Sequence, residues 1–331
     1  MSIAHHEERT PFLKEKPFSL MAPRLVVVLP AYNEALTIAQ SIEGFHRALP
    51  DAAIWIVDNR CSDNTRAIAI QTLSELNCQG GVLSERRPGK ANALRRAFMD
   101  HEADIYVVSG ADCTYPPEAA EELIAPVLAG AADMVVGDRH SAGNYAAENK
   151  RLLHGFGNRL VRDLVNGLFR TRLSDVMSGY RVLNRRFVKS YPILVEGFEI
   201  ETDMTLHALD KRFRIVEIPV NYHDRPAGSF SKLSTVKDGM RVLKTIGNIM
   251  RHYRPLAFFG SSALVFGLLG LLAGWPVVSE WIATHNIDRL PLAILATGLE
   301  IVAVLLLGIG LILDSMVHQN KLQFELDLLN Q

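Results

Sequence analysis

Short apolar runs alternate with longer stretches of helical periodicity through the N-terminal part of the chain. The runs fall at residues 24–29, 53–57, 105–108 and 134–136. Their unbroken apolar character is typical of strands buried on both faces of a sheet. Helical stretches separate them, at residues 35–49, 65–76, 91–101 and 117–128. This alternation predicts an α/β domain with a mostly parallel sheet, whose ligands bind beyond the carboxyl ends of the strands.

The C-terminal third has a different pattern. Leu256 to Trp275 contains no charged residue, and Leu290 to Leu313 contains only Glu300. At about 1.5 Å per residue, each is long enough to cross a hydrocarbon core of about 30 Å. We therefore predict two transmembrane helices. Within a span Glu300 is costly unless it faces protein or water, so it indicates either a contact between helices or a subunit interface.

The orientation of the predicted spans follows from their flanking charges. The linker at 276–289 has one basic residue, whereas five precede the first span: Lys237, Arg241, Lys244, Arg251 and Arg254. The positive-inside rule then places the first 250 residues and both termini in the cytoplasm, with the spans in the inner membrane.

Two amphipathic stretches precede the spans. Apolar residues recur at helical spacing in residues 151–172 and again in residues 234–254, and both stretches are rich in basic residues. Basic amphipathic helices beside a span commonly lie at the membrane interface. Packing against the globular core is the alternative. Proximity to the first span favours the interface more for the second stretch than for the first.

These patterns predict the organisation of the whole chain. A flexible leader (1–22) precedes the α/β domain (23–233), and a juxtamembrane helix (234–254), two spans (255–315) and a cytoplasmic tail (316–331) follow. The formal net charge is −1, which gives no general attraction to nucleic acid. The three cysteines lack metal-ligand spacing, which fits a reducing compartment without zinc or disulfides.

Four polar loops follow the four predicted strands: PAYNE (30–34), DNRCSDNT (58–65), SGADCTYPP (109–117) and GDRHS (137–141). Because the carboxyl ends of parallel strands meet at one edge, these loops predict a nucleotide-binding crevice. The chain contains neither a GxGxxG nor a GxxxxGK[ST] motif, so neither a dinucleotide-binding fold nor a P-loop is supported. In the third loop Asp112 is acidic, while Gly110 stands where a second acid would be expected.

The chain resembles the polyprenyl-phosphate glycosyltransferases of glycosyltransferase family 2, which include dolichol-phosphate mannose synthase and its bacterial glucosyl relatives. Six of its motifs occur in the same order as in that family. The matching motifs are LPAYNEALTI, IVDNRCSDNT, RPGKANALRRAF, VVGDR, SDVMSGYRVLNRRF and EIPVNYHDRPAGSFSKL. The resemblance covers residues 24 to 254 and extends to the two terminal spans. It implies a GT-A fold, which is a Rossmann-like α/β domain.

The resemblance also implies a set of site residues. The nucleotide-sugar, linked to UDP or GDP, would contact Pro30, Tyr32, Glu34, Val57, Asp58, Asn59, Lys90, Ala111 and Asp112. A divalent cation, Mg²⁺ or Mn²⁺, would bind Asp112. Phosphate groups of donor and acceptor would contact Arg139, Ser178, Arg181, Arg225 and Lys232. Arginine suits this because its planar fork pairs with two phosphate oxygens.

The expected catalytic residues are Asp112, Asp175 and Arg139. Asp175 precedes the SGYR motif and is either a base or acceptor-orienting carboxylate, or the partner of a neighbouring arginine. Glu201, in the acidic cluster EIETD, would touch the sugar or cap a helix. Lys90 would lie near the nucleotide or remain a solvated lysine. Asn59 departs from the family, which often has two acids there.

The expected acceptor is a polyprenyl phosphate, undecaprenyl or dolichyl, at the membrane. A phosphate monoester is mostly ionised at pH 7, with a second pKa of about 6, and so needs little activation. The resemblance implies inversion at the anomeric carbon, a role in cell-envelope glycan synthesis and a possible homo-oligomer. Two alternatives stay open: transfer to another lipid head group, and a membrane-anchored sugar-nucleotide-binding protein with impaired catalysis.

The second alternative rests on Gly110. Because Mg²⁺ commonly takes only one or two protein carboxylates, Asp112 together with a donor diphosphate still defines a site. We therefore expect Gly110 to weaken the affinity for metal or donor without abolishing the chemistry.

Overall fold

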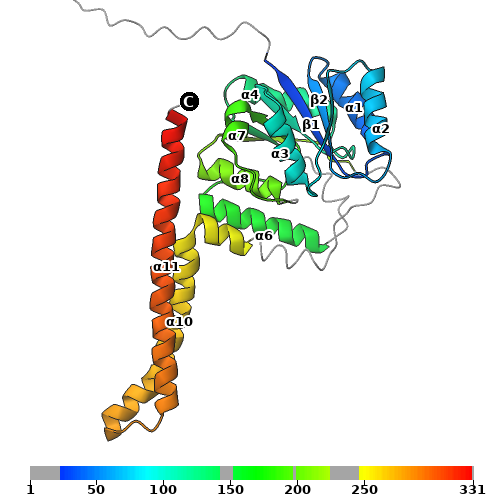
Figure 1. Ribbon diagram of the computed structural model, residues 1–331. Helices are drawn as coiled ribbons and strands as arrows, with labels where there is room; N and C mark the ends of the chain where they lie inside the picture. The colour runs from blue at the N-terminus through cyan, green and yellow to red at the C-terminus, as the bar shows by residue number, and fades with distance from the viewer. Residues whose placement is uncertain (1–22, 142–151, 197–198, 224–245, 330–331) are drawn as a thin grey trace, which may run out of the picture.

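The computed structural model describes residues 23–141, 152–196, 199–223 and 246–329, and it has an α/β domain joined to a long helical hairpin (Figure 1). A seven-stranded sheet forms the centre of the domain, in the order β3-β2-β1-β4-β6-β5-β7. The strands are β1 (Leu25–Ala31), β2 (Ala53–Asp58), β3 (Gly80–Ser84), β4 (Ile105–Val108), β5 (Met134–Asp138), β6 (Arg181–Asn184) and β7 (Ile215–Pro219).

The sheet is mostly parallel, as predicted. β1 pairs in parallel with β2 and β4, β2 with β3, and β5 with β7, whereas β6 runs antiparallel to β4 and β5. The four predicted strands are present to within two residues at either end. Three further strands, β3, β6 and β7, did not follow from the apolar pattern.

Helices cover both faces of the sheet. One face packs against α1 (Ile38–Ala48), α2 (Thr65–Glu75) and α4 (Ala120–Leu128), the last preceded by the short helix η1 (Pro117–Ala119). The other packs against α3 (Lys90–Asp100), α7 (Arg185–Ser190) and α8 (Ile200–Asp210). Alternate residues of β1 point into the two cores, as strand geometry requires, so its unbroken apolar run fills both.

The first amphipathic stretch forms α6 (Leu152–Phe169), and the second is described only at residues 246–253, which are also helical. Val161 and Val165 of α6, Leu206 of α8 and Ile249 share one buried cluster. Leu160, in the apolar stripe read from the sequence, is 39% exposed. Part of the apolar face of each described helix thus packs on the protein, in line with the alternative left open above.

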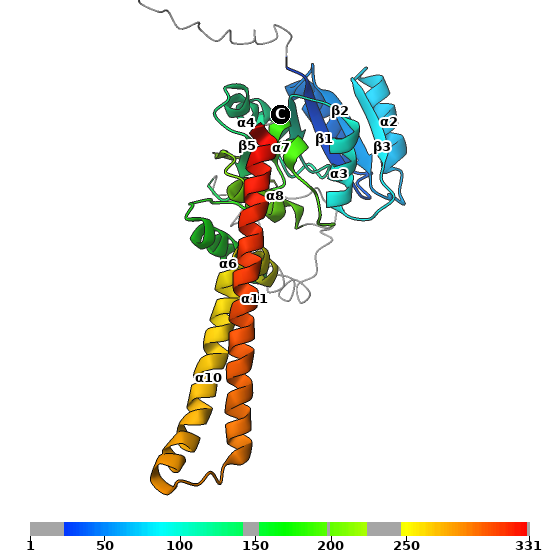
Figure 2. The same cartoon turned by 60° about the vertical axis from the view of Figure 1, so that its left-hand side comes forward.

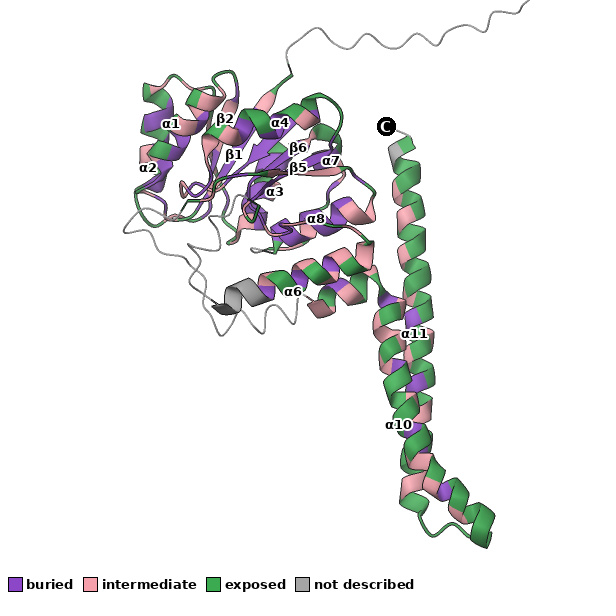
Figure 3. Ribbon diagram, turned by 180° about the vertical axis from the view of Figure 1, so that it is seen from behind, coloured by how far each residue is buried: buried purple, intermediate pink, exposed green. Residues whose placement is uncertain are grey.

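The predicted spans form a hairpin of α10 (Pro255–Thr284) and α11 (Leu290–Leu329), longer than the sequence pattern indicated. Its apolar side chains are largely exposed (Figure 3), as expected for contact with lipid instead of a protein core. Glycines of α10 allow close approach: a Cβ at Gly274 would lie 3.6 Å from Ala296, and one at Gly270 only 2.6 Å from Oε1 of Glu300. These two helices indicate association with a membrane.

Within the expected tail, residues 316–329 are the last part of α11, which packs on the α/β domain (Figure 2). Lys321 pairs with Asp210 at 2.6 Å, and Phe324 contacts the aromatic rings of His207 and Phe213. The charged Lys211 Nζ lies 4.8 Å from the centre of the Phe324 ring, within cation–π distance. The sequence pattern had not indicated that this part of the chain is helical or that it contacts the α/β domain.

Candidate active site

The loops at the carboxyl ends of β1, β2 and β4 are tied together by hydrogen bonds. The Glu34 N–H donates to Thr65 Oγ1 at 2.8 Å, which joins the loop after β1 to the start of α2. Thr37 Oγ1 donates to the carbonyl of Ala111 at 2.8 Å, which joins the loop after β1 to the loop after β4. Glu34 is 8% exposed and Tyr32 49% exposed. The expected convergence of these loops at one sheet edge is present.

The loop after β2 holds Asp58 and Asn59 in different roles. Asp58 accepts the N–H of Cys61 at 2.9 Å and lies 3.6 Å from Arg66. Asn59 is buried, and its amide donates to the carbonyls of residues 85 and 87 and accepts the N–H of residue 89. An aspartate could not donate to those carbonyls. The expected contact between the Asn59 side chain and the nucleotide is therefore not supported, because this amide holds the loop before α3.

Lys90 begins α3 and faces the start of α8. Its Nζ lies 2.6 Å from Oε1 of Glu201, and both side chains are largely buried. A Cβ at Gly179 would lie 2.9 Å from Lys90 Nζ and 3.5 Å from the Tyr115 hydroxyl, so a side chain here would displace the end of Lys90 from Glu201. Tyr115 in turn accepts the N–H of Gly179 at 2.8 Å. The SGYR motif is thereby joined to the loop of Asp112.

Asp112 lies in the loop after β4, where Oδ1 accepts the hydroxyl of Thr114 at 2.7 Å. A Cβ at Gly110 would lie 2.8 Å from this same Oδ1, so a side chain at 110 would converge on Asp112. Among the residues described, no three His, Cys, Asp or Glu side chains gather to hold a metal. One carboxylate fits a Mg²⁺ or Mn²⁺ ion that takes its other ligands from a diphosphate and water.

Arg139 follows β5 and forms a two-point ion pair with Asp175. The Arg139 Nε and Nη2 donate to Oδ2 and Oδ1 of Asp175 at 2.7 and 2.9 Å, and Asp175 is 3% exposed. Burial alone would raise the pKa of Asp175, but the charge and hydrogen bonds of Arg139 outweigh it, so the pKa lies below its ordinary value. His140 Nε2 lies 3.9 Å from the same carboxylate. Asp175 is thus an ionised partner of Arg139, the second of its two anticipated roles.

Tyr222 connects this pair to the loop of Asp112. The Arg139 guanidinium lies 5.7 Å from the centre of the Tyr222 ring, and the Tyr115 ring lies 5.4 Å from it. Burial, followed by the nearby Tyr115 and Asp112, raises the pKa of Tyr222 to about 12, so its hydroxyl stays protonated at neutral pH. Asp112, the expected metal ligand, and Arg139, an expected phosphate ligand, thus lie near the same aromatic residue, Tyr222.

Several residues expected to contact the nucleotide-sugar or phosphate groups are instead buried within the domain. Arg181 is fully buried in β6, where its guanidinium donates to the carbonyls of Val176 and Ser178 at 3.0 and 2.9 Å. This corrects its expected role in binding phosphate: it holds the SGYR segment. Val57, Ala111 and Ser178 are buried too, and Pro30 pairs with Val57 within the sheet. Arg225 and Lys232 lie outside the described residues.

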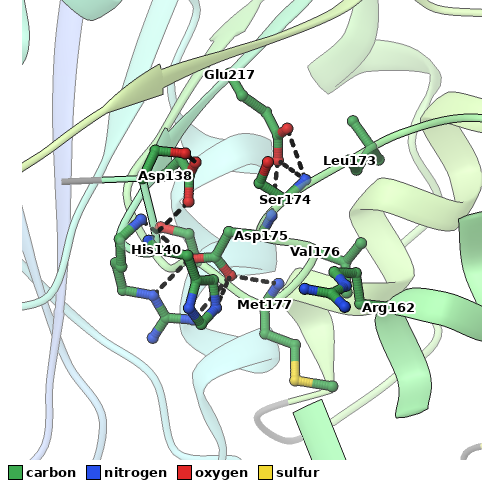
Figure 4. A network of polar contacts seen from close by, with 12 residues as sticks. Asp138, His140, Arg162, Leu173, Ser174, Asp175, Val176, Met177 and Glu217 are labelled. Atoms are coloured by element: carbon green, nitrogen blue, oxygen red, sulfur yellow. Dashed lines mark hydrogen bonds and ion pairs between the residues drawn. The ribbon is translucent and has the colours of Figure 1, made fainter. Parts of the chain in front are cut away.

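Sequence reasoning left three residues of this arrangement without a role: Tyr115, Tyr222 and Glu217. All three occur in quoted loops or motifs, so their presence was visible. Their importance was not, because it depends on the folding of the loops against one another. Glu217, on β7, accepts the backbone N–H groups of Ser174 and Asp175 (Figure 4).

Comparison with known proteins agrees with the fold and identifies the family. The family model for Glycosyl transferase family 2 matches residues 26–191, and the chain belongs to that family. It is a glycosyltransferase with the GT-A fold.

Individual relatives refine this assignment. The chain is 27% identical over 300 residues to glycosyltransferase AglJ of Haloferax volcanii, covering 90% of this chain and 95% of AglJ. It is also 27% identical over 256 residues to the dolichol-phosphate mannosyltransferase of Pyrococcus furiosus, covering 75% and 68% of the two chains. Glucosyl-3-phosphoglycerate synthase from Mycobacterium tuberculosis, solved with Mn²⁺, UDP and glucosyl-3-phosphoglycerate, has a TM-score of 0.55 at 21% identity. That match covers 69% of this chain and 79% of the synthase.

Proposed function

We propose that this enzyme transfers a sugar from a UDP- or GDP-linked donor to a polyprenyl phosphate at the cytoplasmic face of the membrane, with inversion at the anomeric carbon. One observation carries the proposal most: an α/β domain of the glycosyltransferase family 2 type is joined in one chain to a hairpin of two helices long and apolar enough to span a membrane. A soluble acceptor would require no hairpin. The relative from Pyrococcus furiosus, named as a dolichol-phosphate mannosyltransferase, supports a polyprenyl acceptor.

In the proposed reaction, an acceptor phosphate oxygen forms a bond to the anomeric carbon while the bond from that carbon to the donor diphosphate breaks. The nucleoside diphosphate leaves with the electron pair. No proton has to be removed from an ionised phosphate, so the residues act by position and charge. A divalent cation, when bound, would neutralise the departing diphosphate.

The chain's own residues have separate tasks in this proposal. Asp112 would hold the cation against the diphosphate. Arg139 would face a phosphate group, and Asp175 would hold its planar guanidinium in one orientation. Lys90, paired with Glu201, would support the donor side of the crevice. Tyr32, Glu34 and Asp58 would frame the nucleotide.

The test is transfer by membranes containing the full-length protein, supplied with labelled nucleotide-sugars and either undecaprenyl or dolichyl phosphate. We expect labelled lipid that requires Mg²⁺ or Mn²⁺ and that is absent when Asp112 is replaced by Asn. Transfer to diacylglycerol but not to either phosphate would identify another lipid head group as the acceptor. Nucleotide binding without transfer across a broad donor panel would identify an impaired binding protein and refute the proposal.

A further inference from the structure

Glu217 lies in the middle of β7, opposite Val136 of β5, and its side chain points toward the segment that precedes β6. Its Oε1 accepts the N–H of Asp175 at 2.8 Å and that of Ser174 at 3.0 Å, and Oε2 accepts the Ser174 N–H at 2.8 Å. Figure 4 shows Glu217 on one side of this segment and His140 on the other. Glu217 contacts the segment but is not placed in the crevice.

The segment depends on such side-chain contacts because it has no regular structure. Residues 171–180 lie between α6 and β6 and form neither helix nor strand. Asn166 of α6 holds Leu173 through two hydrogen bonds of 2.9 Å, and Glu217 holds the next two residues. Hydrogen bonds to an ionised carboxylate are about twice as strong as neutral ones, so Glu217 is the stronger of the two clamps.

The position of this segment determines where Arg139 lies. The backbone N–H of Asp175 donates to Glu217, and the Asp175 carboxylate accepts two hydrogen bonds from the guanidinium of Arg139. A shift of the Asp175 backbone would therefore move both oxygens that orient Arg139. Glu217 therefore acts on Arg139 through the backbone that carries Asp175.

The electrostatic surroundings of Glu217 disfavour the ionised form of its carboxyl group. Burial raises the pKa of Glu217, and the nearby Asp138 and Asp175 raise it further, although the two backbone N–H groups oppose the effect. Arg139 and His140 are the cationic or titratable partners that face Asp175 from the loop after β5. The ionised form of Glu217 is therefore disfavoured, and as the pH falls Glu217 gains a proton before Asp175, whose pKa is lowered.

We propose that Glu217 is a positioning residue for the transfer reaction: its carboxylate fixes the Ser174–Asp175 backbone so that Asp175 presents Arg139 to the reacting phosphates. This inference rests on the proposed function. It assigns a task to a residue that has no direct contact with the Arg139 side chain.

The experiment compares Glu217→Leu, Asp175→Asn and the double variant in the full-length protein, with Glu121→Gln, an exposed glutamate of α4, as the control. We expect Glu217→Leu to lower kcat about ten- to a hundredfold, as displacement of a reacting group by about 1 Å can, while the KM for the nucleotide-sugar stays unchanged. In the Asp175→Asn background, Glu217→Leu should lower kcat no further, because both changes remove the same orientation of Arg139. An equal additional loss in that background would overturn the inference.

Glu217→Gln is the second variant, in case the leucine variant does not fold. A glutamine oxygen placed at Oε1 can accept both N–H groups. We therefore expect Glu217→Gln to keep most of the wild-type kcat, whereas Glu217→Ala, which has no oxygen at that place, should lower kcat as the leucine variant does. A kcat of Glu217→Gln as low as that of Glu217→Ala would overturn the inference.

The two levels of the hypothesis fail differently. If the wild-type protein transfers no sugar to any lipid phosphate, the proposed function fails. If the wild-type protein transfers sugar and Glu217→Leu does so at the same kcat, only the positioning role fails.

Discussion

The sheet edge and the α10–α11 hairpin both enclose carboxyl groups, but they surround them differently. At the sheet edge Asp175 is paired at two points with Arg139 and also accepts the Met177 N–H at 3.1 Å. In the hairpin, Oε1 of Glu300 is buried against Gly270, and it has no hydrogen-bond partner within the part of the chain that the structure describes. Asp175 is buried with charged and backbone partners, whereas Glu300 is half-buried and its enclosed oxygen lies against the backbone of a glycine.

The difference teaches what each region is built to do. A buried ion pair with fixed geometry is poor evidence for stability, but it presents a guanidinium in one orientation, which recognition of phosphate requires. A carboxyl packed against a glycine instead depends on close helix contact, of the kind that small residues allow in membranes. We therefore expect substitutions at the edge to change turnover and substitutions along the helices to change assembly.

Asp112→Asn should have the largest effect, because it should change turnover at the sheet edge and leave the hairpin unaffected. Loss of the carboxylate that would hold the cation removes charge stabilisation of the departing diphosphate, so turnover should fall on the order of a hundred- to a thousandfold. The amount of protein in the membrane fraction should not change, because the hairpin is untouched. Asp51→Asn, an exposed aspartate in the same domain, is the matched control. Equal activity of the two variants would remove Asp112 from the site.

Gly110→Asp sharpens the comparison within the edge itself. A side chain at 110 would meet Asp112 Oδ1, so the two carboxylates would share a cation. We expect half-maximal activity at about tenfold lower Mn²⁺ concentration, the scale on which neighbours of a metal ligand act. Gly110→Ala displaces Asp112 without adding a ligand and should raise the requirement. An unchanged metal titration in Gly110→Asp would count against the single-carboxylate site.

Phe324→Ala with Lys321→Ala tests the one described contact between the far end of α11 and α8. Removal of a partly buried ring and an ion pair should weaken this contact by about 1 to 2 kcal/mol. Amide hydrogens of residues 200–210 should then exchange faster with solvent, whereas those of α1 keep their rates. Leu326→Ala, at a side chain that is 52% exposed on the same helix, provides the control. Unchanged exchange in α8 would show that the contact contributes little.

The pH dependence of stability gives the smallest expected effect. The pKa of Glu217 is raised by folding, so its ionisation costs stability as the pH rises above its unfolded value of about 4.3 and through the folded one. Asp175 has a lowered pKa and behaves in the opposite sense, losing its stabilising contribution as the pH falls through the folded value. Thermal unfolding of Glu217→Gln should therefore improve relative to wild type as the pH rises from 4. A constant difference across that range would contradict the assignment.

Four strands of the sheet and the polar loops at their carboxyl ends were predictable because the sequence pattern of each is local. Unbroken apolar runs marked β1, β2, β4 and β5, and a polar loop followed each one. β3 begins with two glycines, Gly80 and Gly81, and is partly exposed, so its apolar pattern is weak. β6 begins at Arg181, which was expected to bind phosphate although its side chain is fully buried.

Within the site, the sequence indicated which residues lie near the crevice better than it indicated their contacts. A motif gives the residue type, but the direction of a side chain depends on neighbours far along the chain. Asn59 turns toward residues 85–89, and Arg181 turns toward carbonyls at 176 and 178. Glu217 lies 42 residues from Asp175 in sequence, and only the parallel pairing of β5 and β7 brings it near that loop.

The continuity of α11 has a consequence for kinetics. One helix of 40 residues, about 60 Å at 1.5 Å per residue, runs from the turn of the hairpin to its contact with α8. A catalytic domain held in this way stays within a few tens of ångströms of the bilayer. On the proposed function, donor molecules reach it by diffusion through solution, but acceptors reach it only by lateral diffusion. Its rate would then follow the surface density of lipid phosphate, and diluting the acceptor with other lipids would slow it even at constant bulk concentration.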